Sequence, residues 1–320
     1  MGDRPNRNEE PDPASTPEFR WQLFRVRRHV GWARAQGIGR LIEEDQLDPF
    51  ERIPAAIRRA WWRQQHDSRP NAVPVFIVGV QRSGTNMLTR GLERAPEFEV
   101  HNENDREAFV RFRLKNPTVI RGIVERSKHA FVLFKPLCDS HRITALLDAL
   151  DTPSRGRAIW AYRGYPGRVR SSVAKFGDSN RKALRRIAAG VGSHLWQAGG
   201  LSTANLELIK RFDYDRMTPE SAAALFWFVR NSLYFDLALD QRPDVALASY
   251  ESMIERPGVA MRALCSFLGL PYREQLIEGI EPRHGGSLGI EIDPVVQERC
   301  EELQRALDAT VARRAVHPDG

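Results

Sequence analysis

The chain has 320 residues with 42% hydrophobic and 28% charged side chains, the composition of a globular protein long enough to bury a substantial core in one or two domains. No apolar run approaches the ~20 residues that span a bilayer, the polar N-terminus has no signal-peptide core, and the three scattered cysteines form no CxxC pair, so we predict a cytoplasmic protein without a disulfide framework or structural zinc site. Forty-eight Lys and Arg against 41 Asp and Glu give a net charge of +7, which indicates an anionic partner such as nucleic acid, a membrane surface or a phosphorylated ligand.

Residues 1–70 differ in composition from the rest of the chain. Residues 1–19 contain four prolines and five acidic residues against two arginines, which predicts a disordered tail. Residues 20–70 carry eleven arginines and six acidic residues, with apolar side chains at roughly helical spacing, and predict an arm of two amphipathic helices. This arm has two interpretations: a helical arm packed on the core with its arginines in solvent, or a peripheral contact with an anionic membrane surface or acceptor.

Residues 71–320 alternate between short apolar runs and helical segments, which predicts one further domain. The predicted strands and the helices that follow them are residues 73–79 and 85–93, 130–134 and 141–150, 158–162 and 167–176, and 245–249 and 257–268. A largely helical insertion is predicted over residues 181–240 and a C-terminal helix over 293–316. The alternation predicts an α/β fold of three layers, with a central, mostly parallel sheet between helices.

A glycine-rich turn joins the first predicted strand to its helix. The segment from Gly79 to Thr85 has the spacing of a phosphate-binding loop, with four residues between its two glycines. A Walker loop continues with Lys and then Ser or Thr, which reach the β/γ-phosphates and magnesium, but here Thr85 and Asn86 follow Gly84. The cation of this loop is Arg82 instead, and we predict no metal.

Polar residues also follow the other predicted strands. Lys135 follows the second, Arg163 the third, and Tyr250 and Glu251 the fourth. Ligands of open α/β sheets bind beyond the carboxyl ends of the strands. A lone cation after a strand is usually solvated, but two of them beside a loop that contains Arg82 favour a ligand with more than one anionic group.

Three segments, in order along the chain, resemble sulfotransferases of bacterial type that use 3′-phosphoadenosine 5′-phosphosulfate (PAPS). The segment from Phe76 to Leu88 resembles their 5′-phosphosulfate loop, and Arg163 with Ser171 eight positions later resembles their 3′-phosphate motif. Residues 249–271 resemble their C-terminal strand–helix signature, with Ser-Tyr-Glu, a proline and Phe-Leu-Gly-Leu-Pro. More weakly, residues 283–286 (Arg-His-Gly-Gly) resemble the Arg-Lys-Gly sequence that closes over the 3′-phosphate and adenine.

The resemblance implies a P-loop-like fold, in-line transfer of a sulfonate from PAPS to a hydroxyl or amine, release of PAP (3′-phosphoadenosine 5′-phosphate) and no required metal. It implies that the two anionic ends of PAPS are held by two groups of residues. These are Gln81, Arg82, Ser83, Gly84, Thr85 and Asn86 at the 5′ end, and Arg163, Ser171 and Arg283 at the 3′ end. Arg82 and Lys135 are the candidate catalytic cations, since charge develops on the leaving oxygen.

The resemblance also bears on the general base that would take the proton of the acceptor. Cytosolic small-molecule sulfotransferases place a histidine two residues after the lysine that follows the second strand, but this chain has Leu137 there. Carbohydrate and tyrosyl-protein sulfotransferases use a glutamate downstream of the loop helix, a position that Glu103 resembles. Glu103 is therefore our candidate base, with His101 and His141 as alternatives and an exposed Glu103 without a role as a further one.

Two other function classes stay open from the sequence. A P-loop nucleotide kinase or NTPase would need the missing lysine and magnesium ligand. A basic nucleic-acid-binding protein is supported only by the charge of residues 20–70. We predict a sulfotransferase without a nucleic-acid partner. Its acceptor is a small molecule, carbohydrate or lipid that the sequence does not identify. The sequence also leaves the oligomeric state open.

Overall fold

The computed structural model describes residues 71–150, 154–280 and 289–316, with side chains to residue 313, and six positions between residues 57 and 65. The chain divides into two compact units, Met1–Ala56 and Ile57–Gly320, and every described residue belongs to the second. The predicted tail and almost all of the predicted arm therefore lie outside the described residues. The domain boundary at residue 71 stays a prediction.

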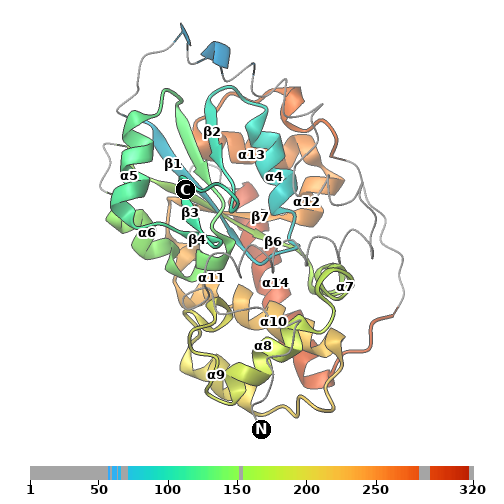
Figure 1. Ribbon diagram of the computed structural model, residues 1–320. Coiled ribbons are helices and arrows are strands. Elements are labelled where there is room, and N and C mark those ends of the chain that lie inside the picture. The colour runs from blue at the N-terminus through green and yellow to red at the C-terminus, as the bar shows by residue number, and fades with distance from the viewer. Residues whose placement is uncertain are drawn as a thin grey trace. The chain divides into compact units, whose positions relative to one another are not determined.

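Five parallel strands form the central sheet, in the order β2-β5-β1-β6-β7 (Figure 1). Their bounds are Val73–Gly79 for β1, Phe98–His101 for β2, Phe131–Phe134 for β5, Arg157–Tyr162 for β6 and Val245–Ser249 for β7. The register pairs Val73 with Phe131 on one side of β1 and Val75 with Arg157 on the other. The strands therefore end at a common carboxyl edge, with β1 in the middle.

Helices cover both faces of the sheet, which confirms the predicted α/β fold of three layers (Figure 1). Because side chains alternate along a strand, Val75 and Ile77 of β1 enter one hydrophobic core and Phe76 and Val78 enter the other. The first core contains residues of α4 (Thr85–Glu93), α12 (Tyr250–Glu255) and α13 (Pro257–Leu268). The second contains residues of α5 (Pro117–Arg126), α6 (Ile143–Ala149), α7 (Tyr165–Phe176), α10 (Pro219–Asn231) and α14 (Pro294–Val316).

The helical insertion and the C-terminal helix are present as predicted. Between α7 and β7 the chain forms α8 (Ser179–Ala188), η2 (Trp196–Ala198), α9 (Thr203–Lys210), α10, α11 (Leu233–Asp236) and η3 (Leu239–Gln241). Helix α10 is buried along almost its whole length between α7, α8 and α14. A short helix η4 (Glu274–Leu276) packs on α4. Within the described residues, no helix is long and apolar enough to span a membrane.

Four elements between α4 and β5 were not predicted from the sequence. Strand β2 forms one edge of the sheet, β3 (Phe109–Val110) and β4 (Arg113–Leu114) form a separate antiparallel hairpin, and α5 follows the hairpin. Helix α5 begins in the usual way, with the Asn116 side chain accepting from the backbone N–H of Val119 at 3.0 Å and a proline in the first turn. The predicted helix over residues 141–150 is present as α6 (Ile143–Ala149), and a 3₁₀ helix, η1 (Leu137–Arg142), leads into it.

Candidate functional site

The carboxyl edge of the sheet gathers the predicted site residues in a fixed order. Reading across the strands, Glu103 follows β2, Lys135 follows β5, the glycine-rich loop follows β1, and Arg163 follows β6. Tyr250 begins α12 directly after β7. The cations therefore lie around the central loop, while the candidate base lies beyond Lys135 at the β2 end of the edge.

Both glycines of the loop are required by their backbone conformation and by their neighbours. Gly79 has φ = 122°, and a Cβ there would lie 2.2 Å from the carbonyl oxygen of Ala161 in β6. Gly84 has φ = 82°, and a Cβ there would lie 2.5 Å from the Tyr250 ring. Arg82 also has a positive φ, 73°, which is uncommon for a residue with a side chain. The loop thus turns sharply while it is packed closely between β6 and α12.

Helix α4 begins at this loop without a side-chain cap. Its N-cap is Gly84, which has no side chain to form a cap hydrogen bond, and its first turn has no acidic residue. Beside it, the Ser83 side chain is buried, and its Oγ has no hydrogen-bond partner in the part of the chain that the structure describes. Uncapped amides at a helix N-terminus and an unpaired buried hydroxyl are groups that an anion can satisfy.

Arg82 and Ser171 come from the two separate motifs and contact each other. The Arg82 Nε donates to Ser171 Oγ at 2.9 Å, across 89 positions of sequence. The adjacent Ser172 is fully buried and accepts from the Asn180 side chain at 2.7 Å, so it faces α8 instead. Of the two serines, Ser171 is therefore the one that lies at the loop, as its spacing favoured.

Lys135 reaches the start of α4 from the neighbouring strand. Its Nζ donates to Asn86 Oδ1 at 2.7 Å. Asn86 occupies the position where a Walker loop carries its magnesium-binding hydroxyl. An amide oxygen that holds a lysine thus stands at that position.

Arg163 follows β6 in a turn whose backbone is held from three sides. The Arg163 carbonyl accepts from the Trp227 side chain at 2.8 Å, the Gly164 N–H donates to Glu251 Oε1 at 3.0 Å, and the Tyr165 N–H donates to Gln304 Oε1 at 3.1 Å. Glu251 therefore holds the backbone of this turn. From the sequence alone, this role could not be distinguished from general support of the fold.

The Arg163 side chain itself lies over an aromatic ring. Its Cζ is 4.2 Å from the centre of the Tyr250 ring, and its Nε is buried with no hydrogen-bond partner within the described segments. Burial lowers the pKa of the guanidinium, with the nearby charge of Arg82 acting in the same direction. The half-buried Arg163 thus keeps a buried N–H without an acceptor, next to the loop cation.

Glu103 lies in a half-buried turn two residues after β2. The alternative base His101 ends that strand, and both of its ring nitrogens are engaged, with Asp105 Oδ2 at 2.7 Å and Glu99 Oε1 at 3.2 Å. Although burial opposes the shift, Glu99 and Asp105 raise the pKa of His101. Burial alone would raise the pKa of Glu99. Hydrogen bonds from His101 and Ser127 outweigh it and lower that pKa to about 2. A histidine whose two ring nitrogens are both held by carboxylates is not a free base.

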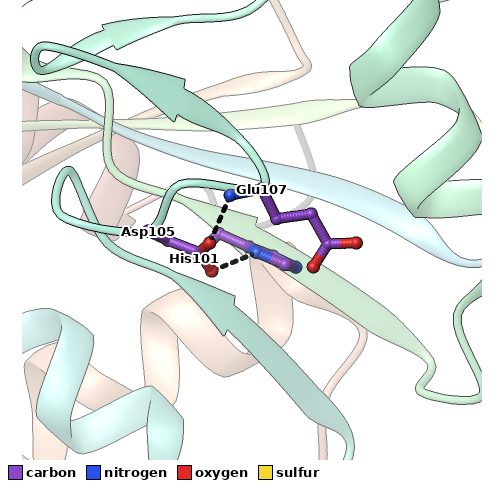
Figure 2. Close-up of side chains that lie close together, drawn as sticks. All are labelled: His101, Asp105 and Glu107. Carbon is purple, nitrogen blue, oxygen red and sulfur yellow. Dashed lines mark hydrogen bonds and ion pairs between the residues drawn. The ribbon is translucent and has the colours of Figure 1, made fainter.

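The same histidine belongs to a group that could be taken for a metal site. Ligand atoms of His101, Asp105 and Glu107 lie within 4.8 Å of one another, and Figure 2 shows them side by side. In addition, Asp105 Oδ1 accepts from the Glu107 backbone N–H at 2.7 Å, while the Glu107 carboxylate pairs with Arg126. Because a metal needs the neutral form of histidine, the raised pKa of His101 opposes a metal here. These contacts brace the turn that carries Glu103.

His141, the other alternative base, lies in η1. Its Nδ1 is buried and has no hydrogen-bond partner in the described parts of the chain, and its ring packs against Gly199 and Gly200. Burial, together with the charges of Arg230, Arg113 and Arg142, lowers the pKa of His141 to about 3. A general base works best with a pKa near the operating pH, so this value argues against His141 as the base.

The sequence did not single out two residues that hold the loop. The Ser140 hydroxyl accepts from the Gly79 N–H at 3.0 Å and lies 3.1 Å from the Gly79 carbonyl. Arg168 donates from Nε to the Gln81 carbonyl at 3.3 Å. Arg168 precedes Ser171 by three positions on α7, so helical spacing could have placed both on the face towards the loop. Nothing in the sequence around Ser140 distinguishes it. Arg283 lies outside the described residues.

Comparison with known proteins adds little to this geometry. No family model matches the sequence, and no curated protein matches it. Among solved structures, the chain is similar to the sulfotransferase domain of the olefin synthase from Synechococcus PCC 7002, over 77% of this chain and 95% of that one, with 15% sequence identity and a TM-score of 0.37. A similarity this low carries no argument about activity, so the function has to be inferred from the residues of the edge.

Proposed function

We propose that the protein is a sulfotransferase that moves a sulfonate group from PAPS to a hydroxyl or amine of an acceptor. The observation that carries this proposal is the 2.9 Å hydrogen bond between Arg82 and Ser171. It joins the loop after β1 to the helix after β6, the two segments that resemble the 5′-phosphosulfate and 3′-phosphate motifs. One ligand with two anionic groups can therefore engage both segments at once.

The unsatisfied groups at the edge fit the two anionic ends of PAPS. At the 5′ end, the uncapped start of α4, the Ser83 hydroxyl and Arg82 would surround the phosphosulfate. At the 3′ end, Arg163 and Ser171 would hold the phosphate, which carries about −1.5 to −2 charges. The buried Arg163 Nε, which has no acceptor in the described residues, would gain one there. The oxyanions would thus satisfy donors that the fold leaves unpaired.

The proposed reaction is a direct displacement at sulfur. The acceptor oxygen forms a bond to sulfur and gives its proton to Glu103, while the bond between sulfur and the 5′-phosphate oxygen breaks and that oxygen leaves with the electron pair as PAP. Arg82 and Lys135 would balance the charge that develops on the leaving oxygen. The order of these residues along the carboxyl edge of the sheet fits their proposed roles. Arg82 and Lys135 lie where the PAPS phosphosulfate would bind, and Glu103 lies beyond Lys135, where the acceptor would bind.

The kinase alternative is weakened by the position that Asn86 occupies. Its side chain accepts from Lys135, and no hydroxyl stands there for magnesium. The nucleic-acid alternative depends on residues 20–70, which lie almost wholly outside the described residues. Neither alternative gains an observation that favours it over sulfonate transfer.

Nucleotide binding by the full chain tests the proposal. Calorimetry with PAP, ADP and ATP, each with magnesium and with EDTA, should give tight binding of PAP that does not depend on the metal. A matched pair of variants, Ser171→Ala and Ser172→Ala, should separate a serine at the loop from one buried against α8, with only Ser171→Ala weakening PAP. Turnover would then be followed with sulfur-labelled PAPS and panels of phenols, sugars and lipids. Magnesium-dependent binding of ATP without binding of PAP would establish the kinase alternative instead.

A further inference from the structure

A fully buried arginine, Arg168, contacts the glycine-rich loop after β1 from inside the protein. Arg168 of α7 has no exposed surface, and its guanidinium lies 5.1 Å from the centre of the Phe226 ring. Its Nε donates to the Gln81 carbonyl at 3.3 Å, and its Nη1 donates to the Ala223 carbonyl of α10 at 2.9 Å. Its Nη2 is buried and has no hydrogen-bond partner among the described residues. Arg168 therefore links the loop to the helical insertion and keeps one donor unsatisfied.

This buried charge has no counter-ion within the described residues. None of their carboxylates forms an ion pair or hydrogen bond with Arg168, whose two acceptors are both backbone carbonyls. Burial, together with the positive charge of Arg82, lowers the pKa of Arg168 to about 9. Cys300 lies nearby, but burial raises the pKa of its thiol, which stays neutral at pH 7. A buried charge without a partner is costly, so an arginine here calls for a compensating role.

The contact with Gln81 determines how the loop presents its backbone. In a trans peptide the C=O and the following N–H point in opposite directions. Because the Gln81 carbonyl is turned inward to Arg168, the N–H of Arg82 is turned away from it. Arg82 has a positive φ of 73°, so this peptide orientation is not one that its side chain favours.

We propose that Arg168 is a positioning residue for anion binding: it holds the Gln81–Arg82 peptide in the orientation that the loop needs, and the anionic end of the bound nucleotide supplies the counter-charge that the protein lacks. The inference rests on the proposed function for the identity of the nucleotide, but not for the presence of an anion. The charge of Arg168 acts through the loop rather than by contact, because its side chain is inaccessible to a ligand. A unit charge within ~10 Å at an effective dielectric constant near 20 changes binding by about tenfold or more.

The chain offers a matched control in Arg230. This arginine of α10 is also buried, its pKa is lowered by burial to about 10, and it donates to the carbonyl of Gly199 at 2.7 Å. Its carbonyl partners lie in residues 196–199, so it does not touch the loop. Replacing Arg230 therefore removes a buried positive charge, as replacing Arg168 does, but leaves the hydrogen bond to the Gln81 carbonyl in place.

The experiment compares Arg168→Met with Arg230→Met in the full chain. Thermal unfolding should show that both variants fold, calorimetry should give the affinity for PAP, and steady-state kinetics should give KM and kcat for PAPS. We expect Arg168→Met to weaken PAP by about tenfold or more and to raise KM more than it lowers kcat. Arg230→Met should lower the melting temperature while it leaves PAP affinity within about threefold of the wild type. Normal PAP affinity in a folded Arg168→Met protein would overturn the inference.

A second variant and a second probe keep the test decisive. If Arg168→Met does not fold, Arg168→Lys keeps the charge but cannot hold both carbonyls at once, and it should weaken PAP more than Arg230→Lys does; equal affinities in those two variants would refute a role for Arg168 in the loop. If the wild-type protein does not bind PAP, the proposed function fails, and inorganic pyrophosphate replaces PAP as the probe. Loss of pyrophosphate binding in the Arg168 variant alone would then support the inference independently of sulfonate transfer. A wild-type chain that binds neither probe would overturn both.

Discussion

Replacement of Arg163 by alanine tests how the edge distinguishes PAP from a nucleotide without a 3′-phosphate. A hydrogen bond to a charged group contributes about 1.5–3 kcal/mol, and each 1.4 kcal/mol is about a tenfold change in affinity, so Arg163→Ala should raise the Kd for PAP by about 10- to 150-fold. Without ligand, the variant loses the contact with the Tyr250 ring at 4.2 Å, which contributes about 0.5–1 kcal/mol at exposed sites. The fold should therefore persist, because the hydrogen bonds that Trp227, Glu251 and Gln304 make to this turn involve only its backbone.

The assay is calorimetric titration with PAP and with AMP, which lacks the 3′-phosphate. Affinity for AMP should change by less than about threefold, since its phosphate lies at the loop end of the site. Arg170→Ala is the matched control, because it removes a charge that acts on Arg163 but is no part of either motif. Arg170 is half-buried and still reaches solvent, so its effect on PAP should stay within about fivefold. Equal losses for PAP and AMP in Arg163→Ala would show that Arg163 supports the fold rather than binding the 3′-phosphate.

Three further predictions concern the loop, the turn beside it and the base. Gly84→Ala should lower the free energy of unfolding by about 2–4 kcal/mol, measured in urea, because strain at positive φ and overlap with Tyr250 add; Gly190→Ala, which has a positive φ but open space, should cost only about 1–2 kcal/mol. Because the pKa of Glu99 is lowered to about 2, its stabilising effect is present above its unfolded pKa of about 4.3 and is lost as pH falls towards 2. The stability difference between wild type and Glu99→Gln should therefore shrink across that interval, and a constant difference would contradict the pairing. Glu103→Gln should lower kcat by about 10²–10⁴ while PAP affinity is unchanged, and a normal kcat there, with a folded but inactive His141→Ala, would reassign the base.

The central strands could be predicted because each is a fully buried apolar run between turn residues. Strand β1 is an example, with six of its seven residues buried, and its bounds were predicted correctly. Strand β2 was missed because it is a four-residue edge strand that contains Glu99 and His101. Those polar residues are tolerated because Ser127, Asp105 and each other satisfy them, and such contacts form only in the folded protein.

The site was predictable in outline and not in its contacts. Parallel strands bring their carboxyl ends to one edge, so Lys135, the loop and Arg163 could be placed together from the sequence. The sequence could not show that Arg82 lies on Ser171 or that Asn86 holds Lys135, because these contacts depend on side-chain directions across three strands. Arg168 was missed because an arginine in an amphipathic helix is ordinarily read as exposed.

The turn that carries Arg163 is completed by the last helix of the chain. Gln304 of α14 accepts from the Tyr165 N–H, 139 positions away, and Asp308 of α14 accepts from the Tyr162 hydroxyl at 2.7 Å. Every predicted binding residue precedes α14 in the sequence, so the Arg163 turn lacks these two hydrogen bonds until α14 docks. Truncation ahead of residue 294 would remove none of those residues and would still leave the Arg163 turn without two of its braces. The proposed 3′-phosphate site would thus depend on docking of a helix whose contact residue lies 139 positions further along the chain.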